Sequence, residues 1–137
     1  MQKDPLYVVA LKGNVSQLES LDLEAVDSNS LNESLMYAQQ VEVMYNLLEA
    51  GANPVYGESI SLVIASRMGA ISSVNLLLAN GADACCNNGA AIMAATENGR
   101  YQVLEILLKQ AGTETFKEEA LELAQRYKQV KCIELLS

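Results

Sequence analysis

The residues of this chain that could do covalent or metal chemistry are its three cysteines, because the sequence contains no histidine. Cys85 and Cys86 are adjacent, and Cys132 lies far from them. Without imidazole there is no catalytic triad, and without C-x-x-C spacing no four-ligand zinc site is evident. Cys132 falls on an apolar stripe and is predicted to be a core residue. Cys85 and Cys86 are either plain loop residues or regulatory thiols.

The carboxylates and glycines give no sign of an active site either. Neighbouring acidic residues such as Glu118 and Glu119 lie in polar segments, whereas a catalytic pair needs a shaped cleft. No glycine-rich stretch matches a phosphate-binding loop. The sequence therefore favours a protein without catalysis, cofactor or metal. A thiol-based enzyme or redox sensor that uses Cys85 and Cys86 stays open as an alternative.

Charge narrows the class of partner. The chain has 137 residues and a net charge of −8. It has only nine lysines and arginines, so direct binding to nucleic acid or to an anionic membrane is not expected. Residues 1–68 hold nine acidic and three basic residues, and residues 69–137 hold eight and six. The first half could attract a basic protein, or its charge could simply keep the protein soluble.

The expected location in the cell depends on three features that we looked for in the sequence: a disulfide framework, a membrane span and a signal peptide. An odd number of cysteines does not form a disulfide framework. No apolar run approaches the roughly 18 residues of a membrane span, and the first residues do not form a signal peptide. We expect a cytoplasmic protein, with delivery into a host cell by a signal-less route as the alternative.

One phrase occurs three times and reveals how the elements are organised. Residues 47–54 read "LLEAGANP", residues 76–84 "LLLANGADA" and residues 107–115 "LLKQAGTET". The first two are in register at an offset of 30. Around each phrase, apolar residues recur at spacings of three and four, which indicates helices. Glycine then follows, as is typical just past a helix end. Each unit is predicted to be helix, tight turn, helix and glycine cap.

This pattern resembles the ankyrin repeat, whose period is 33 residues and whose signature is T-P-L-H-x-A. The best match to that signature is "DPLYVVALKGN" at residues 4–14, and "GADA" at residues 81–84 matches the start of the family's loop. The resemblance implies an all-α, helix-turn-helix repeat solenoid in one domain. We expect five units, at about residues 1–28, 29–54, 55–84, 85–115 and 116–137.

The units depart from the family pattern in two ways. From Gly81 to Ala95 there are 14 residues, about three fewer than the family has, so shortened β-hairpin turns with little or no sheet are expected. The second unit has "YAQQVEV" where the first, third and fourth units have glycine between the helices, and the fifth unit lacks this glycine as well. Its neighbour, the first unit, is expected to have a short second helix at residues 15–21. A tetratricopeptide array or a plain helical bundle fits the repeat less well.

The resemblance also implies where a partner would bind, because ankyrin repeat proteins bind other proteins with turn tips and exposed positions of the inner helices. Carried onto this sequence, the partner-binding positions are Asn53, Tyr56, Glu58, Arg67, Met68, Asp83, Cys86, Asn87, Asn88, Glu97, Asn98, Arg126 and Tyr127. Met68 and Tyr127 are the strongest candidates. The alternative interpretation of Tyr56, and also of Phe116, is that the side chain packs onto the next unit's first helix.

From size, charge and missing chemistry, we expect a monomer that binds a basic protein and blocks it. An immunity protein, an antitoxin or a pathogen-encoded inhibitor acts in this way. The alternative is an adaptor or secreted effector scaffold that bridges two proteins through separate surfaces.

Overall fold

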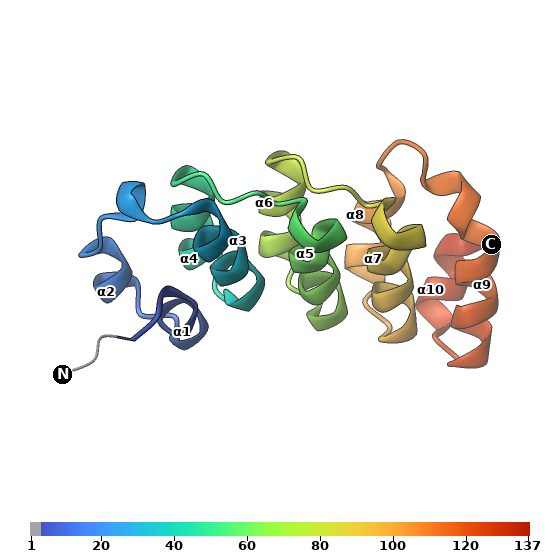
Figure 1. Ribbon diagram of the computed structural model, residues 1–137. Coiled ribbons are helices and arrows are strands. Elements are labelled where there is room, and N and C mark those ends of the chain that lie inside the picture. Colours follow the sequence, from blue (N-terminus) through green and yellow to red (C-terminus); the bar gives the residue numbers. More distant parts are fainter. Residues whose placement is uncertain (1–3) are drawn as a thin grey trace.

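The computed structural model describes residues 4–137 of the chain, so the predicted start of the first unit at residues 1–3 lies outside the described residues. The α-helices are α1 (Leu6–Lys12), α2 (Val15–Glu19), α3 (Ser28–Tyr37), α4 (Val41–Glu49), α5 (Tyr56–Met68), α6 (Ile71–Ala79), α7 (Cys86–Glu97), α8 (Tyr101–Leu108), α9 (Lys117–Arg126) and α10 (Val130–Leu136). Two 3-10 helices, η1 (Leu23–Ala25) and η2 (Thr113–Phe116), lie between pairs. Figure 1 shows the helix pairs in a row, with the N- and C-terminal ends far apart.

The prediction of an all-α repeat solenoid with short turns is confirmed. Residues 4–137 contain helices and turns but no β-strand. Within the same residues, every helix is too short or too polar to reach across a lipid bilayer. The unit boundaries themselves stay a prediction.

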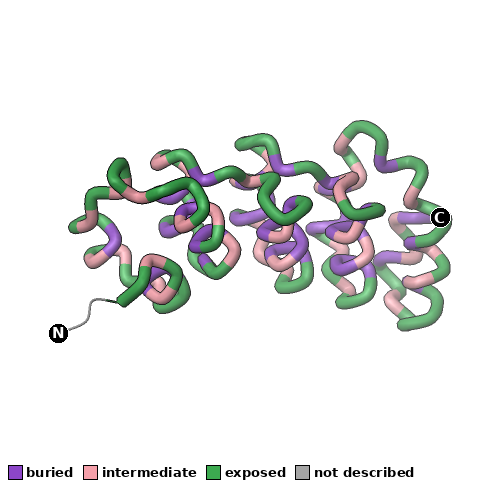
Figure 2. The backbone as a smooth tube through the Cα atoms, in the orientation of Figure 1, coloured by how far each residue is buried: buried purple, intermediate pink, exposed green. Residues whose placement is uncertain are grey.

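Buried leucines recur in the core at the offset of the sequence repeat. Leu47, Leu77 and Leu107 occupy the same place in α4, α6 and α8, and each is fully buried. Each such leucine contributes about 1.5–3 kcal/mol by leaving water. Figure 2 shows the buried residues on the faces between helices and the exposed residues along the turns. Because each pair packs on its neighbours, one continuous core runs through the stack. Cys132 belongs to it, as predicted.

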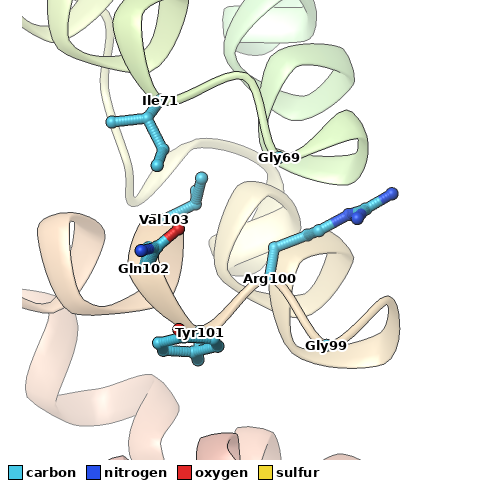
Figure 3. Close-up of a pocket in the computed structure, with 7 residues that line it drawn as sticks. All are labelled: Gly69, Ile71, Gly99, Arg100, Tyr101, Gln102 and Val103. Carbon is cyan, nitrogen blue, oxygen red and sulfur yellow. The ribbon is translucent and has the colours of Figure 1, made fainter.

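Two of the joints between neighbouring pairs are bridged by the residue that precedes the second helix of the later pair. Arg100 Nε donates to the backbone carbonyl of Arg67 at 3.0 Å. Gln129 Nε2 donates to the carbonyl of Glu97 at 2.9 Å. We call Arg100 and Gln129 the bridging residues. Figure 3 shows Arg100 near Gly69, at the edge of a small pocket of about 150 Å³. A Cβ at Gly69 would lie 2.8 Å from the Cδ of Arg100, so the arginine needs glycine beneath it.

The second pair has no such bridge to the third. Helix α3 ends at Tyr37, and Ala38 is extended, with φ of −69° and ψ of 125°. The residue before α6 is Ala70, whose side chain is too short to reach back. Contact between α3 and α5 is sparser than between α5 and α7. The missing glycine and the missing bridge therefore occur at the same joint.

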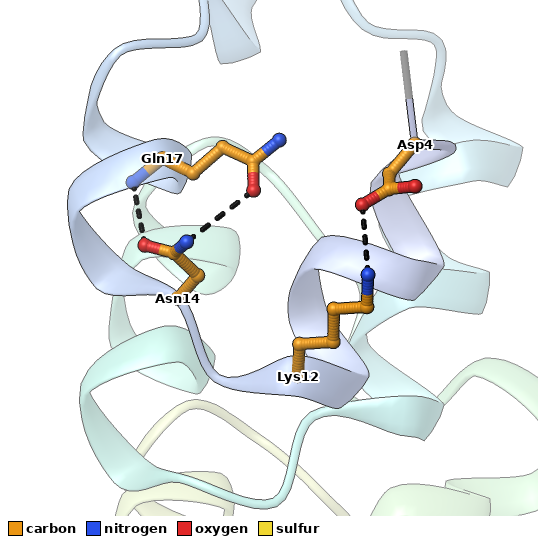
Figure 4. A network of polar contacts seen from close by, with 4 residues as sticks. All are labelled: Asp4, Lys12, Asn14 and Gln17. Atoms are coloured by element: carbon orange, nitrogen blue, oxygen red, sulfur yellow. Dashed lines mark hydrogen bonds and ion pairs between the residues drawn. The ribbon is translucent and has the colours of Figure 1, made fainter. Parts of the chain in front are cut away.

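The two end pairs differ from the middle of the stack. Helix α2 ends at Glu19, two residues earlier than predicted. Its N-cap is Asn14, whose Oδ1 accepts from the backbone N–H of Gln17 at 3.0 Å, and Lys12 pairs with Asp4 at 3.1 Å (Figure 4). At the other end, Lys128 has a φ of +57° where Gly69 and Gly99 follow the first helices of their pairs.

Candidate functional site

Figure 1 shows the inner helices α5, α7 and α9 side by side. Two hollows lie between these helices. A cavity of about 590 Å³ lies between α5 and α7, and one of about 350 Å³ lies between α7 and α9. They share Met93 and Glu97. We call both together the inner groove. Its lining residues are Ile60, Val63, Arg67, Asn87, Ala90, Met93, Ala94, Glu97, Asn98, Glu119, Glu122, Leu123 and Arg126.

The turns above the groove have an unusual backbone. Glu58 and Ser59 in α5, and Asn87 and Asn88 in α7, all have φ between +54° and +60°. Together with Gly57 and Gly89 they form a left-handed turn at the start of each helix. The left-handed conformation costs a non-glycine residue roughly 1–2 kcal/mol, and asparagine tolerates it best. The two asparagines that the sequence placed in the binding surface thus also fit this turn.

Side-chain hydrogen bonds hold these turns in place. Asp83 Oδ1 accepts from the backbone N–H of Cys85 at 2.8 Å, and Asn53 Oδ1 accepts from that of Val55 at 2.9 Å. The buried Ser59 hydroxyl accepts from the backbone N–H of Asp83 at 3.0 Å. One turn is thereby tied to the next, so the side chains between them are presented on fixed backbone.

All the partner-binding positions predicted from the sequence are exposed except Cys86, which is half-buried. The inner groove brings together Arg67, Asn87, Glu97, Asn98 and Arg126. Met68 and Tyr127 lie at the ends of α5 and α9, with 51% and 48% of their surfaces exposed. The remaining positions lie outside the groove on the turns: Asn53, Tyr56, Glu58, Asp83, Cys86 and Asn88.

Sequence reasoning missed the floor of the groove and one of its walls. The floor includes Val63 and Met93, and the wall includes Glu119 and Glu122. Helical spacing could have identified them, because Val63 and Met93 each lie four residues before a position that was assigned. The prediction used only the helix ends and did not follow the same face back along the helix.

The two aromatic residues with an alternative interpretation behave differently. Phe116 packs against the preceding pair, since a Cβ at Gly89 would lie 2.8 Å from its Cγ. It is half-buried and joins the edge of the core. Tyr56 remains 39% exposed at the start of α5. Phe116 therefore serves packing, on the preceding rather than the next pair, and Tyr56 stays available at the surface.

Burial raises the pKa of two of the three cysteine thiols, Cys85 and Cys132. All three thiols are free. Burial, assisted by the Asp83 carboxylate, raises the pKa of the Cys85 thiol, and Cys85 Sγ donates to the carbonyl of Ala111 at 3.5 Å. Cys86 Sγ accepts from the Ser59 hydroxyl at 3.6 Å. Because the thiolate is the reactive form, the raised pKa of Cys85 argues against a thiol-based activity.

No metal centre is built by the acidic residues and cysteines of residues 4–137, because no three of them gather closely enough to hold an ion. The inner groove has an apolar floor and a charged rim, an arrangement that suits contact with another macromolecule.

Comparison with known proteins agrees with this fold. A family model described as ankyrin repeats (3 copies) matches residues 61–137, more than half of the chain. No curated protein matches the sequence.

Proposed function

The chain belongs to the ankyrin repeat family, and from this premise we propose that it binds a protein with a basic contact surface and blocks it without catalysis. Ankyrin repeats form protein–protein interaction modules. The basic partner and the blocking role are the parts that need support from the residues themselves.

The observation that carries the proposal is the inner groove. Met93 lies at its centre and lines both cavities. Around this apolar floor are the carboxylates of Glu97, Glu119 and Glu122, with a single arginine from α5 and one from α9 at the margins. An apolar centre within a polar rim is the usual anatomy of a protein interface, and the acidic rim favours lysine or arginine on the partner.

The charge of the whole chain supports a basic partner as well. Residues 13–66 contain eight aspartates and glutamates but no lysine or arginine. In the described part of the chain, the only ion pair joins Lys12 and Asp4, both outside that stretch. The carboxylates of residues 13–66 are therefore uncompensated and would accelerate encounter with a basic protein at low salt.

The experiment is affinity capture from source-cell and host-cell lysates at low and moderate salt, with the captured proteins identified by mass spectrometry. The groove variant Glu97→Lys/Glu122→Lys reverses two rim charges. Its matched control, Glu105→Lys/Glu134→Lys, makes the same charge change at exposed positions of α8 and α10. We expect one stoichiometric partner that is weakened by salt, lost with the groove variant, retained with the control and inhibited when its own activity is assayed.

Other outcomes would contradict the proposal in distinct ways. Several salt-insensitive partners would indicate an adaptor, and a captured partner with undiminished activity would exclude a blocking role. A Cys85→Ser/Cys86→Ser variant tests the thiol alternative. Loss of function in this variant, with fold and capture intact, would favour thiol chemistry, whereas unchanged function would exclude it.

A further inference from the structure

A second hollow lies on the outer helices, among residues that the inner groove does not use. It has a volume of about 400 Å³. The residues that line it are Val15 and Glu19 from α2, Val41, Glu42, Tyr45 and Asn46 from α4, and Leu76 from α6. We infer that this outer hollow binds a cationic amphipathic helix of another protein, as a docking surface separate from the inner groove.

The hollow runs along the outer helices of the first two pairs. Its lining includes both ends of α2, Val15 and Glu19. Val41 and Tyr45 lie one turn apart on the face of α4 that lines the hollow. They are 37% and 53% exposed, respectively. Two neighbouring apolar groups are thus left in contact with water beside a concave surface.

Comparison with the other outer helices shows that the repeat does not need Tyr45 for its packing. The equivalent positions in α6, α8 and α10 are Asn75, Glu105 and Glu134, which are all polar and exposed. At the next position along each helix the pattern is the opposite, with a polar residue in α4 and apolar residues in the others. It is Asn46 in α4, and it is Leu76, Ile106 and Leu135 in the other helices. A tyrosine that faces solvent where the repeat has a polar residue is the type of side chain that dominates binding at interfaces.

The charge around the hollow selects the partner. Glu19 and Glu42 flank the apolar residues, and no lysine or arginine lines the hollow. Both carboxylates lie in the stretch of residues 13–66 that has no basic residue. A second copy of this chain would place its own acidic outer helices against them, and an anionic membrane would be repelled in the same way. A surface that carries lysine or arginine is the complementary occupant.

A helix fits the shape better than an extended segment. The hollow is lined mainly by α2 and α4, with one residue from α6, and a helix of a partner can pack into the groove between two helices. Its apolar stripe would contact Tyr45 and Val41. Basic side chains on the two sides of that stripe would then meet Glu19 on α2 and Glu42 on α4. Helix-in-groove recognition of this kind is common among protein complexes.

The probe for the test is a fluorescent, designed helical peptide with a leucine stripe flanked by lysines, whose binding is measured by fluorescence anisotropy. Tyr45→Asn places at this position the residue that α6 has, so it is compatible with the fold. We expect it to raise the Kd of the peptide at least about tenfold, as loss of an interface hot spot does. Glu42→Lys should have a similar effect. Glu105→Lys, an equal charge change on α8, and the groove variant Glu97→Lys/Glu122→Lys should each change the Kd by less than about threefold.

Each of the following results would overturn the inference. In the first, Tyr45→Asn binds the peptide as tightly as the wild type, or the peptide binds to neither. In the second, Glu105→Lys weakens binding as much as Glu42→Lys, which would mean only general electrostatic attraction. In the third, sedimentation shows a dimer that Tyr45→Asn dissociates, so that the occupant is a second copy. Loss of binding in the groove variant alone would assign the peptide to the inner groove instead, and circular dichroism of each variant excludes unfolding as the cause.

Discussion

Arg100 and Arg67 belong to neighbouring helix pairs, and the side chain of Arg100 caps the C-terminal end of α5, the helix that contains Arg67. The Nε of Arg100 donates to the carbonyl of Arg67 at 3.0 Å, while the aliphatic part of the same side chain covers Gly69. The last carbonyls of a helix have no partner within the helix, so the bond satisfies one of them. Gln129 does the same for Glu97 one pair later.

Replacing Arg100 should weaken this joint. We expect Arg100→Ala to lower the free energy of unfolding by about 1 kcal/mol, because one hydrogen bond and the cover over Gly69 are lost. Arg100→Gln should lose less, since Gln129 makes the equivalent bond with the same side chain. Urea unfolding followed by circular dichroism measures both. An Arg100→Ala variant as stable as the wild type would show that the bridge contributes nothing.

The left-handed backbone at Lys128 predicts a substitution that stabilises the protein. Lys128 has a φ of +57° and is exposed, at the place where two other pairs have glycine. We expect Lys128→Gly to raise the free energy of unfolding by about 1 kcal/mol by removing this strain. Lys128→Ala removes the charge but keeps the Cβ, so it should give no gain. If alanine stabilises the protein as much as glycine, the cause is charge and not backbone strain.

A buried hydroxyl in α5 should also be dispensable. Ser66 is fully buried, and its Oγ has no hydrogen-bond partner in the described structure. The equivalent residue in α7, Thr96, is buried too, but its hydroxyl donates to the carbonyl of Ile92 at 2.8 Å. We expect Ser66→Ala to stabilise the protein by about 1 kcal/mol and Thr96→Val to destabilise it. Thermal unfolding of both variants checks the contrast, and a loss of stability in Ser66→Ala would mean that its hydroxyl is paired in solution.

The cap of α3 predicts a dependence on pH. The Ser30 hydroxyl donates to Asp27 Oδ1 at 2.7 Å and the Ser30 N–H donates to Oδ2 at 3.1 Å, and these bonds lower the pKa of the Asp27 carboxyl. A lowered pKa in the folded state gives stability that is present above about pH 4 and is lost as the pH falls through the lowered value. Asp27→Asn can still cap the helix but does not titrate.

We therefore expect the wild type to lose stability relative to Asp27→Asn as the pH falls below about 4. Urea midpoints measured at a series of pH values give the comparison. Asp22→Asn is the control, because the Asp22 side chain makes no capping hydrogen bond to η1. A difference between wild type and Asp27→Asn that is the same at every pH would contradict the prediction.

Much of the fold follows from the sequence because the repeat leaves few alternatives. Leucines at an offset of 30, such as Leu47 and Leu77, can share one core only if the units stack. The left-handed turns could not be predicted from the sequence, because Glu58 and Ser59 are not residues that favour positive φ. Eight of the thirteen residues that line the inner groove were also missed. Glu119 and Glu122 form a wall only when α9 is beside α7, and that depends on how the pairs stack rather than on local pattern.

The joint after the second helix pair has a consequence for how the molecule comes apart. A linear stack opens where two neighbours hold each other least, and here the glycine, the bridging side chain and dense contact are all missing between α3 and α5. We therefore expect the first two helix pairs to form one cooperative block and the other three pairs a second. Thermal motion should separate these blocks before it melts either one. We expect the protein to bend most readily at this joint, which would change the angle between the first two helix pairs and the inner groove.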